Sequence, residues 1–175
     1  MQAIQHPAAW LPADLTAAAE RWQYTFTDED IEELTQGLAQ IQASKKVVPQ
    51  FGKEDFPLPK LMQKLAPYQH ELDLGLGVFY VRGFPVDQFS KDEASAIFWG
   101  LGMHFGQPWE QNLRGHLLGD VINEGRSIDD TSARGYQTTA NLDMHTDGAD
   151  LVGLLCLKQA TVGGGSRIVS GMAVY

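Results

Sequence analysis

The chain has 175 residues, 43% hydrophobic and 20% charged, which is enough for one globular domain with a hydrophobic core. The formal net charge is −9, and an acidic surface repels phosphate backbones, so we expect no nucleic-acid partner. The longest apolar run, 151–157, has seven residues, whereas a membrane helix needs roughly 20, so we expect no membrane partner. With no signal-peptide pattern at the start, we expect a cytoplasmic protein.

The single cysteine, Cys156, lies inside the apolar run LVGLLCL. One cysteine cannot form a disulfide within the chain, and free cysteines usually pack as small hydrophobic residues. We therefore expect a buried thiol, which fits a reducing compartment.

Two helices are predicted from their start signals. Thr27 is a candidate N-cap with Asp30 three residues on, and Ser90 with Glu93 repeats the pattern. We expect the second helix to end near Gly106. The residues predicted to face the core are Ile31, Leu34, Leu38 and Ile41 in the first helix and Ala94, Ile97, Phe98 and Leu101 in the second.

The later part of the chain favours strands. Residues 76–86 are rich in β-branched and aromatic side chains and predict a buried strand, and 116–122 predicts another. The stretches 135–147 and 151–157 predict a strand or a strand pair, and 166–170 a short strand after the glycine turn. Helices followed by strands indicate an α+β fold. We expect a single domain, residues 1–175, with a helical region to about residue 70 and a β-rich part from about 71 to 175.

The last residues carry no cap or stop signal, and the few late strands are too few to close a sandwich or barrel. We therefore expect the chain to be the N-terminal part of a longer protein. The alternative is a small domain whose last element lies close to its end.

His145 and Asp147 form the pattern that bears most directly on function. In a strand, residues two apart point to one face, so Asn141, Asp143, His145 and Asp147 would line one polar wall. An imidazole and a carboxylate with open positions make two-thirds of the facial triad that holds non-haem Fe(II). The alternative interpretation is a surface aspartate that hydrogen-bonds a nearby histidine.

The order of segments around this pair resembles a known family. HTD, then LVGLLCL, then GGGSRIVSGMAVY, preceded by GVFYVRGFPV and FSKDEASAIFWGLGMHFGQP, is similar to the taurine dioxygenase-like (TauD/TfdA) family of Fe(II)/2-oxoglutarate-dependent oxygenases. The resemblance covers roughly residues 70–175. It implies a jelly-roll (double-stranded β-helix) fold with flanking helices, and we expect this fold to be incomplete in this chain.

The resemblance also implies a chemistry and roles for residues. His145 and Asp147 would be metal ligands for Fe(II), and Ser166 would hydrogen-bond the distal carboxylate of the cosubstrate 2-oxoglutarate. Asn141 would line the pocket for cosubstrate and substrate. The implied reaction uses O₂ and 2-oxoglutarate and releases succinate and CO₂. It oxidises a C–H bond of a small molecule by hydroxylation, desaturation or ring closure. The sequence does not name that small molecule. The oligomeric state is not defined by the sequence either.

Two family features are missing from the printed sequence. The family carries a third ligand, a histidine, on a later strand and then an arginine for the cosubstrate, but no histidine follows His145 and the only later arginine is Arg167. We expect structural or surface roles for the four upstream histidines, His6, His70, His104 and His116. Because losing even an outer partner of a metal site costs about 10–100-fold, the chain as given is predicted to be weakly active or inactive.

Two other classes remain open at this point. One is a zinc hydrolase that uses His145, Asp147 and an upstream histidine, although such enzymes usually carry denser histidine clusters. The other is a non-enzymatic binding domain with an incomplete site. Metal analysis and replacement of both residues by alanine separate these readings.

Overall fold

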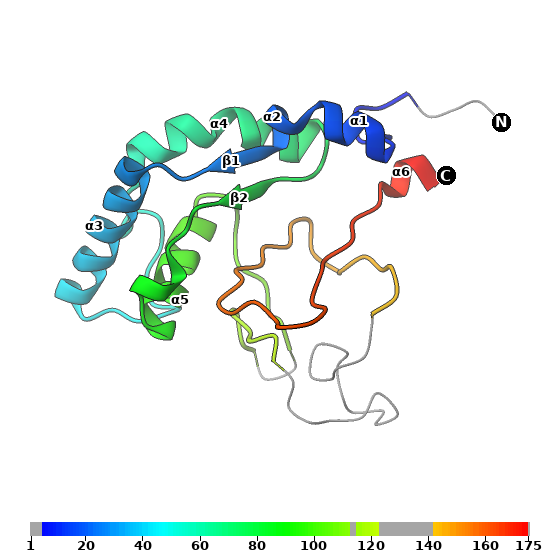
Figure 1. Ribbon diagram of the computed structural model, residues 1–175. Helices are drawn as coiled ribbons and strands as arrows, with labels where there is room; N and C mark the ends of the chain where they lie inside the picture. The colour runs from blue at the N-terminus through cyan, green and yellow to red at the C-terminus, as the bar shows by residue number, and fades with distance from the viewer. Residues whose placement is uncertain (1–4, 113–114, 123–141, 175) are drawn as a thin grey trace, which may run out of the picture. The chain divides into compact units, whose positions relative to one another are not determined.

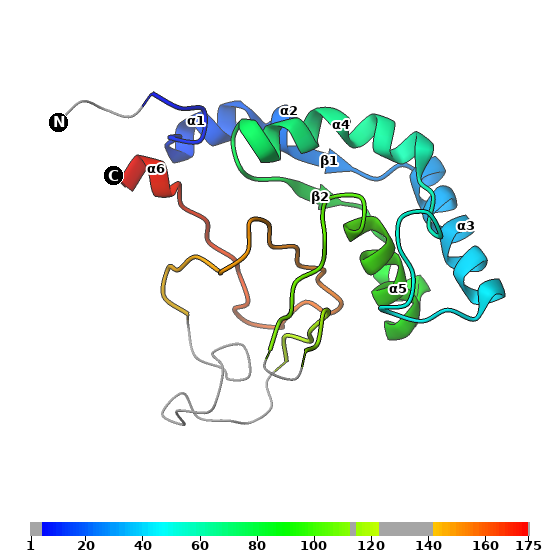
Figure 2. The same cartoon turned by 180° about the vertical axis from the view of Figure 1, so that it is seen from behind.

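The computed structural model describes residues 5–112, 115–122 and 142–174 (Figures 1 and 2). The chain divides into two compact units. The first unit comprises residues 1–107 together with 154–175, and the second comprises 108–153. Every helix and strand formed by the described residues belongs to the first unit. Among the residues described, no helix combines the length and the apolar character needed to cross a bilayer.

The first unit begins with two short helices, α1 (Pro12–Ala17) and α2 (Ala19–Trp22), that enclose a small core. Trp10 and Leu15 pack there against Leu76, with Trp22 partly buried beside them. The Trp10 indole donates a 2.9 Å hydrogen bond to the Leu76 carbonyl oxygen. This cluster therefore joins the start of the chain to a segment more than sixty residues later.

A two-stranded parallel sheet follows, formed by β1 (Gln23–Thr25) and β2 (Tyr80–Arg82) (Figure 1). The predicted strand over 76–86 is thus confirmed for three residues only, and it is half exposed, with Tyr80 at 48%. β2 stays short because β1 offers three pairing residues, and the described chain supplies no other strand. A 3₁₀ turn, η1 (Val86–Gln88), follows β2.

Helices α3 (Asp28–Ser44) and α5 (Lys91–Gly102) confirm both predicted start signals. In α3 the Thr27 hydroxyl accepts from the Asp30 backbone N–H while the Asp30 carboxylate accepts from the Thr27 N–H. Ser90 and Glu93 make the same reciprocal pair at the start of α5. Of the predicted core faces, Leu34, Leu38, Ile41, Ala94 and Ile97 are buried, and Ile31, Phe98 and Leu101 are partly buried.

Helix α4 (Pro59–Leu74) was not predicted. Pro49 and Pro57 in the preceding segment, together with Pro59 at the helix start, indicate a loop, and Pro67 lies inside the helix itself, where it removes one backbone donor. The sequence pattern that indicates helix α4 is the four-residue spacing of Leu61 and Leu65, which are both fully buried. Pro59 at the first turn is compatible with a helix start because its missing N–H is unpaired there in any case.

The main core lies where α3 packs against α4 and α5, and its centre is Phe56. The Phe56 ring is 0% exposed and stacks on Phe51 with 6.2 Å between ring centroids. Gly37 of α3 and Gly100 of α5 leave the space the ring occupies, since a Cβ at Gly37 would lie 2.8 Å from Phe56 Cζ. The other buried hydrophobic residues of the described chain, apart from the Trp10 cluster, are Leu34, Leu38, Ile41, Phe51, Leu58, Leu61, Leu65, Ala94, Ile97 and Trp99.

A buried ionic cluster ties α3 to α4. The Asp30 carboxylate, 1% exposed, accepts hydrogen bonds from Lys64 Nζ and from the Tyr24 hydroxyl, each at 2.7 Å, and from the Thr27 N–H at 2.8 Å. Burial raises the pKa of Asp30, but these donors outweigh burial and bring the pKa down to about 2. Burial first, and then the hydrogen bond to Asp30, raises the pKa of Tyr24 to about 12.

The C-terminal part differs from the predictions. Residues 115–122 and 142–170 form neither helix nor strand, and a short helix, α6 (Gly171–Val174), follows. Ser170 is buried; its hydroxyl donates to the Ala8 carbonyl oxygen and accepts from the Ala173 N–H. Cys156 is exposed, not buried as expected. A strand needs a partner edge, and none of the described residues pairs with this segment, so its apolar side chains face solvent.

The fold class is therefore confirmed only in its coarser form, a mixture of helices with few strands. The described residues form a sheet of two strands, and the jelly roll stays an expectation from the resemblance.

Candidate functional site

The structure brings His145 and Asp147 together, as predicted, but on a different backbone. Residues 142–147 form no strand, so the predicted alternation of a polar and an apolar face is absent, and Leu142 and Met144 are exposed. The two side chains still point the same way, with 3.9 Å between His145 Nε2 and Asp147 Oδ1. Both are accessible, at 55% and 57% exposure.

A short contact within the chain fixes how the His145 imidazole is presented. His145 Nδ1 lies 2.7 Å from the Asp143 carbonyl oxygen. A carbonyl oxygen only accepts, so Nδ1 must carry the proton, and in the neutral ring Nε2 then keeps its lone pair. Backbone carbonyls commonly orient metal-binding histidines in this way. The lone pair is therefore on the nitrogen nearer to Asp147.

This imidazole and carboxylate match the donor types that non-haem Fe(II) takes. Two adjacent ligands at bond lengths near 2.1 Å lie about 3 Å apart in an octahedral site, so His145 Nε2 and Asp147 Oδ1 would need to approach by about 1 Å. Rotation of two exposed side chains supplies such a shift. Within residues 5–112, 115–122 and 142–174, no three His, Cys, Asp or Glu side chains form a group that would hold a metal.

The upstream histidines have local partners of their own. His104 Nε2 lies 2.8 Å from the Phe56 carbonyl oxygen, and His116 Nδ1 lies 3.1 Å from the Asn112 amide. His6 Nδ1 accepts from the Ala8 N–H at 3.1 Å. His70 is exposed on α4. These local placements agree with the structural or surface roles predicted for them.

The remaining predicted residues are not brought to the pair by anything the structure describes. Ser166 is exposed in the first unit, and Arg167 beside it is exposed as well. Asn141 lies outside the described residues. The sequence placed the side chain of Asp143 in the polar wall, but the structure uses its carbonyl oxygen, a main-chain role that no side-chain pattern reveals.

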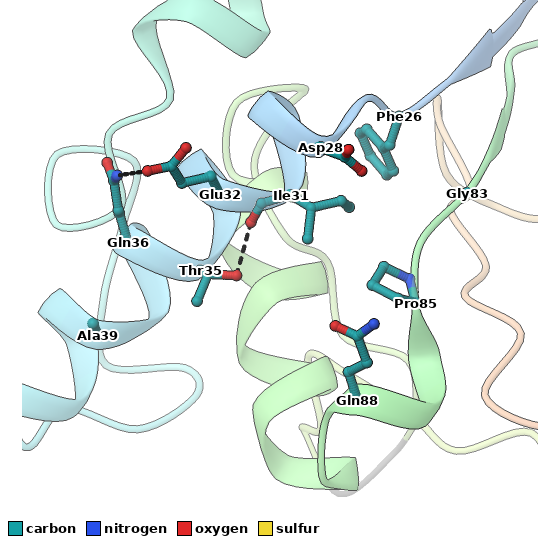
Figure 3. Close-up of a pocket in the computed structure, with 10 residues that line it drawn as sticks. All are labelled: Phe26, Asp28, Ile31, Glu32, Thr35, Gln36, Ala39, Gly83, Pro85 and Gln88. Atoms are coloured by element: carbon teal, nitrogen blue, oxygen red, sulfur yellow. Dashed lines mark hydrogen bonds between the residues drawn. The ribbon is translucent and has the colours of Figure 1, made fainter.

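A separate groove of about 560 Å³ runs along α3 in the first unit (Figure 3). Phe26 and the segment from Gly83 to Gln88 face one side of α3 across it, and the Thr35 hydroxyl turns back to the Ile31 carbonyl oxygen. The lining residues are Phe26, Asp28, Ile31, Glu32, Thr35, Gln36, Ala39, Gly83, Pro85 and Gln88. Their positions in α3 recur at helical spacing, the one sequence signal that could have located the groove.

The groove does not carry the chemistry of a metal site. Its two carboxylates, Asp28 and Glu32, have no imidazole beside them in the lining, and Glu32 accepts from the Gln36 amide at 3.2 Å. On the neighbouring face of α3, Glu29 and Asp30 both form ion pairs with Lys64 of α4. The imidazole and carboxylate at His145 and Asp147 therefore remain the candidate site.

Comparison with known proteins gives this pair its context. Residues 43–175 match the model of the family described as "Taurine catabolism dioxygenase TauD, TfdA family". That match covers well over half of the chain, so the chain belongs to this family.

Two curated relatives match nearly the whole chain. FR-33289 synthase of Streptomyces rubellomurinus is 27% identical over 169 residues, 96% of this chain and 50% of its own length. Taurine hydroxylase-like protein SAT17 of Stachybotrys chartarum is 24% identical over 179 residues, 95% of this chain and 45% of its own length. The chain thus spans about half the length of these relatives.

Proposed function

We propose that this chain contributes the first two iron ligands, His145 and Asp147, to an Fe(II)- and 2-oxoglutarate-dependent oxygenase that oxidises a C–H bond of a small molecule. The observation that carries the proposal is the His145–Asp147 pair, with the Nε2 lone pair held toward a carboxylate, in a chain of the TauD/TfdA family. Family membership favours this reaction over hydrolysis at a zinc ion, and the jelly roll is the fold proposed for the assembled enzyme.

Each residue has a stated part in this proposal. His145 donates Nε2 to the metal while its Nδ1–H bond to the Asp143 carbonyl oxygen holds the ring in place. Asp147 supplies an anionic oxygen, which partly neutralises the metal. When bound, Fe(II) with 2-oxoglutarate and O₂ supplies the oxidising power, leaving succinate and CO₂. Ser166 and Asn141 are proposed to bind the cosubstrate, as the family resemblance implies.

The family's third ligand, a later histidine, has no counterpart after His145 in the printed sequence, and Arg167 is the only arginine there. Two protein ligands hold a divalent ion far less firmly than three, so the chain alone should bind metal weakly and turn over 2-oxoglutarate slowly. We therefore treat metal binding, not turnover, as the primary test of the site.

The test titrates Co(II), as an oxygen-stable stand-in for Fe(II), into the 1–175 chain and follows paramagnetic broadening of backbone amide NMR signals. We expect broadening centred on residues 143–148. His145→Ala and Asp147→Ala should each weaken binding at least about tenfold, because each removes a direct ligand. His116→Ala is the matched control, since His116 is an exposed histidine of the same unit with a local partner.

Two results would contradict the proposal. One is broadening that persists around residues 143–148 in both alanine variants. The other is loss of binding in His116→Ala with retention in His145→Ala. A parallel assay of succinate release from 2-oxoglutarate tests the predicted weakness, since an ordinary enzymatic rate from the isolated chain would show that its site is complete.

A further inference from the structure

Asp147 is followed by a glycine, and this junction is the only Asp-Gly or Asn-Gly pair in the printed sequence. An aspartate side chain can react with the backbone nitrogen of the next residue and close a five-membered succinimide ring. Glycine in the second position favours this reaction, because it has no Cβ to hinder the approach and its backbone adopts more conformations. The junction most open to this chemistry therefore falls on the proposed metal ligand.

The local structure leaves the reacting atoms free to meet. Asp147 and Gly148 lie in neither a helix nor a strand, so no regular pattern of hydrogen bonds fixes their backbone. Among the described residues, the Gly148 N–H donates to no backbone acceptor, and no atom beyond its chain neighbours lies within 4 Å of a Cβ placed there. The Asp147 carboxylate has its ion-pair contact with His145 at the long distance of 3.9 Å. Its side chain can therefore rotate toward the Gly148 nitrogen.

We propose that the Asp147–Gly148 junction is a site of spontaneous succinimide formation, which converts Asp147 to isoaspartate. The Gly148 nitrogen bonds to Asp147 Cγ and gives up its proton. One carboxylate oxygen leaves as water, with that proton and one more from solvent. Water then opens the ring at either carbonyl carbon, which restores aspartate or leaves isoaspartate. No electrons are transferred, and the overall change is an isomerisation that needs no reactant other than water.

Isoaspartate does not present the carboxylate that the candidate site uses. The main chain then runs through the former side-chain carbon Cγ, and the free carboxylate is attached directly to Cα, one carbon closer to the backbone. The carboxylate oxygens are thereby displaced relative to His145 Nε2. This consequence rests on the proposed function, in which Asp147 is a metal ligand. Loss of that ligand should weaken metal binding at least about tenfold.

The reaction joins atoms of two adjacent residues, so it does not depend on contacts with the part of the relatives that this chain does not span. A metal site with open coordination positions also has to leave its carboxylate accessible. When Asp147 is bound to a metal ion, isomerisation should be slower, because the oxygen atom that must leave is then held. The modification is therefore expected mainly in metal-free protein.

The first experiment incubates the metal-free 1–175 chain for several weeks at physiological temperature and follows it by mass spectrometry. The intact chain should show a species lighter by one water molecule. The tryptic peptide 135–158 contains Asp143, Asp147 and Asp150, so two neighbouring aspartates serve as internal references. We expect a separately eluting form of this peptide with unchanged mass, in which electron-transfer fragmentation places isoaspartate at 147. Isoaspartate at 143 and 150 should be several-fold lower, because the residue after each carries a Cβ.

Gly148→Ala is the matched variant. The φ of Gly148 is not positive, and an added Cβ has open space among the described residues, so alanine fits there without strain. G148A keeps His145 and Asp147 but should form isoaspartate several-fold more slowly, because alanine has less backbone freedom than glycine.

The second experiment measures Co(II) binding of both incubated chains by the NMR broadening described above. Binding by the unaltered chain should fall in proportion to its isoaspartate content, and binding by G148A should be retained. A third sample, incubated with Co(II) present, should accumulate less isoaspartate than the metal-free chain.

The absence of isoaspartate at 147 after incubation overturns the proposal. Equal amounts at 143, 147 and 150 also overturn it, as do equal rates in the unaltered chain and G148A, because the glycine would then have no part in the reaction. Isoaspartate at 147 with undiminished Co(II) binding upholds the modification and contradicts the proposed function instead, since Asp147 would then not be a metal ligand.

Discussion

Replacing Asp30 with asparagine is expected to flatten the dependence of stability on pH. In the native chain the Asp30 carboxylate is almost fully buried and receives hydrogen bonds from Lys64, Tyr24 and the Thr27 N–H. An asparagine side chain keeps the shape but carries no charge and has a single acceptor oxygen. The substitution therefore removes the ion pair with Lys64 and weakens the cap at the start of α3.

The size of the effect follows from the pKa. Asp30 titrates near 3.8 in an unfolded chain and at about 2 in the native structure, a difference of nearly two pKa units. Each unit corresponds to about 1.4 kcal/mol, so the carboxylate contributes about 2.5 kcal/mol to the free energy of unfolding at pH 7. Because the native pKa is lowered, this contribution is present above about pH 4 and is lost as the pH falls toward 2.

The assay is urea unfolding of the unaltered chain and of Asp30→Asn at a series of pH values from 7 to 2, followed by circular dichroism. The difference between the two free energies should be about 2.5 kcal/mol at pH 7 and should shrink as the pH falls from about 4 to 2. Glu32→Gln is the control, since Glu32 lies on the solvent face of the same helix. Two curves that stay parallel over the whole range would refute the electrostatic account of Asp30.

Two more predictions concern packing and the alkaline range. Gly37→Ala should lower the free energy of unfolding by about 1–2 kcal/mol, because the added Cβ would clash with the Phe56 ring. Gly102→Ala is the control and should be neutral or stabilising, because, among the described residues, no atom beyond its own stretch of helix lies within 4 Å of its added Cβ. Thermal unfolding measures both variants, and equal effects would contradict the packing argument. In the native chain the pKa of the Tyr24 hydroxyl is raised to about 12. The unaltered chain should therefore have additional stability below about pH 10 that is lost as the pH rises toward 12, and Tyr24→Phe should lack this additional stability. Alkaline unfolding curves check this, and an unchanged slope in Tyr24→Phe would count against a tyrosine bound to Asp30.

The features that the sequence predicted well are local. Thr27 and Ser90 cap helices because the partners they need lie three residues away, so the signal is contained in one short stretch. His145 and Asp147 were expected to lie together for the same reason, since two residues apart they remain neighbours on a strand or on the irregular backbone observed.

The features that were missed depend on distant residues. The length of β2 is set by β1, more than fifty residues earlier, so composition alone over-extends the strand. Helix α4 forms although Pro67 opposes it, because Leu61 and Leu65 are buried against α3 and Lys64 binds Asp30. Cys156 is exposed because an apolar strand is buried only where a partner covers it.

The place of Phe56 between Gly37 and Gly100 has a consequence for sequences related to this one. The ring fills the space that two helices leave by carrying hydrogen in place of a side chain, so the three positions share one volume. A relative with a larger residue at the position of Gly37 or Gly100 should therefore carry a smaller residue at that of Phe56. These three positions, far apart in the chain, are expected to vary together rather than independently.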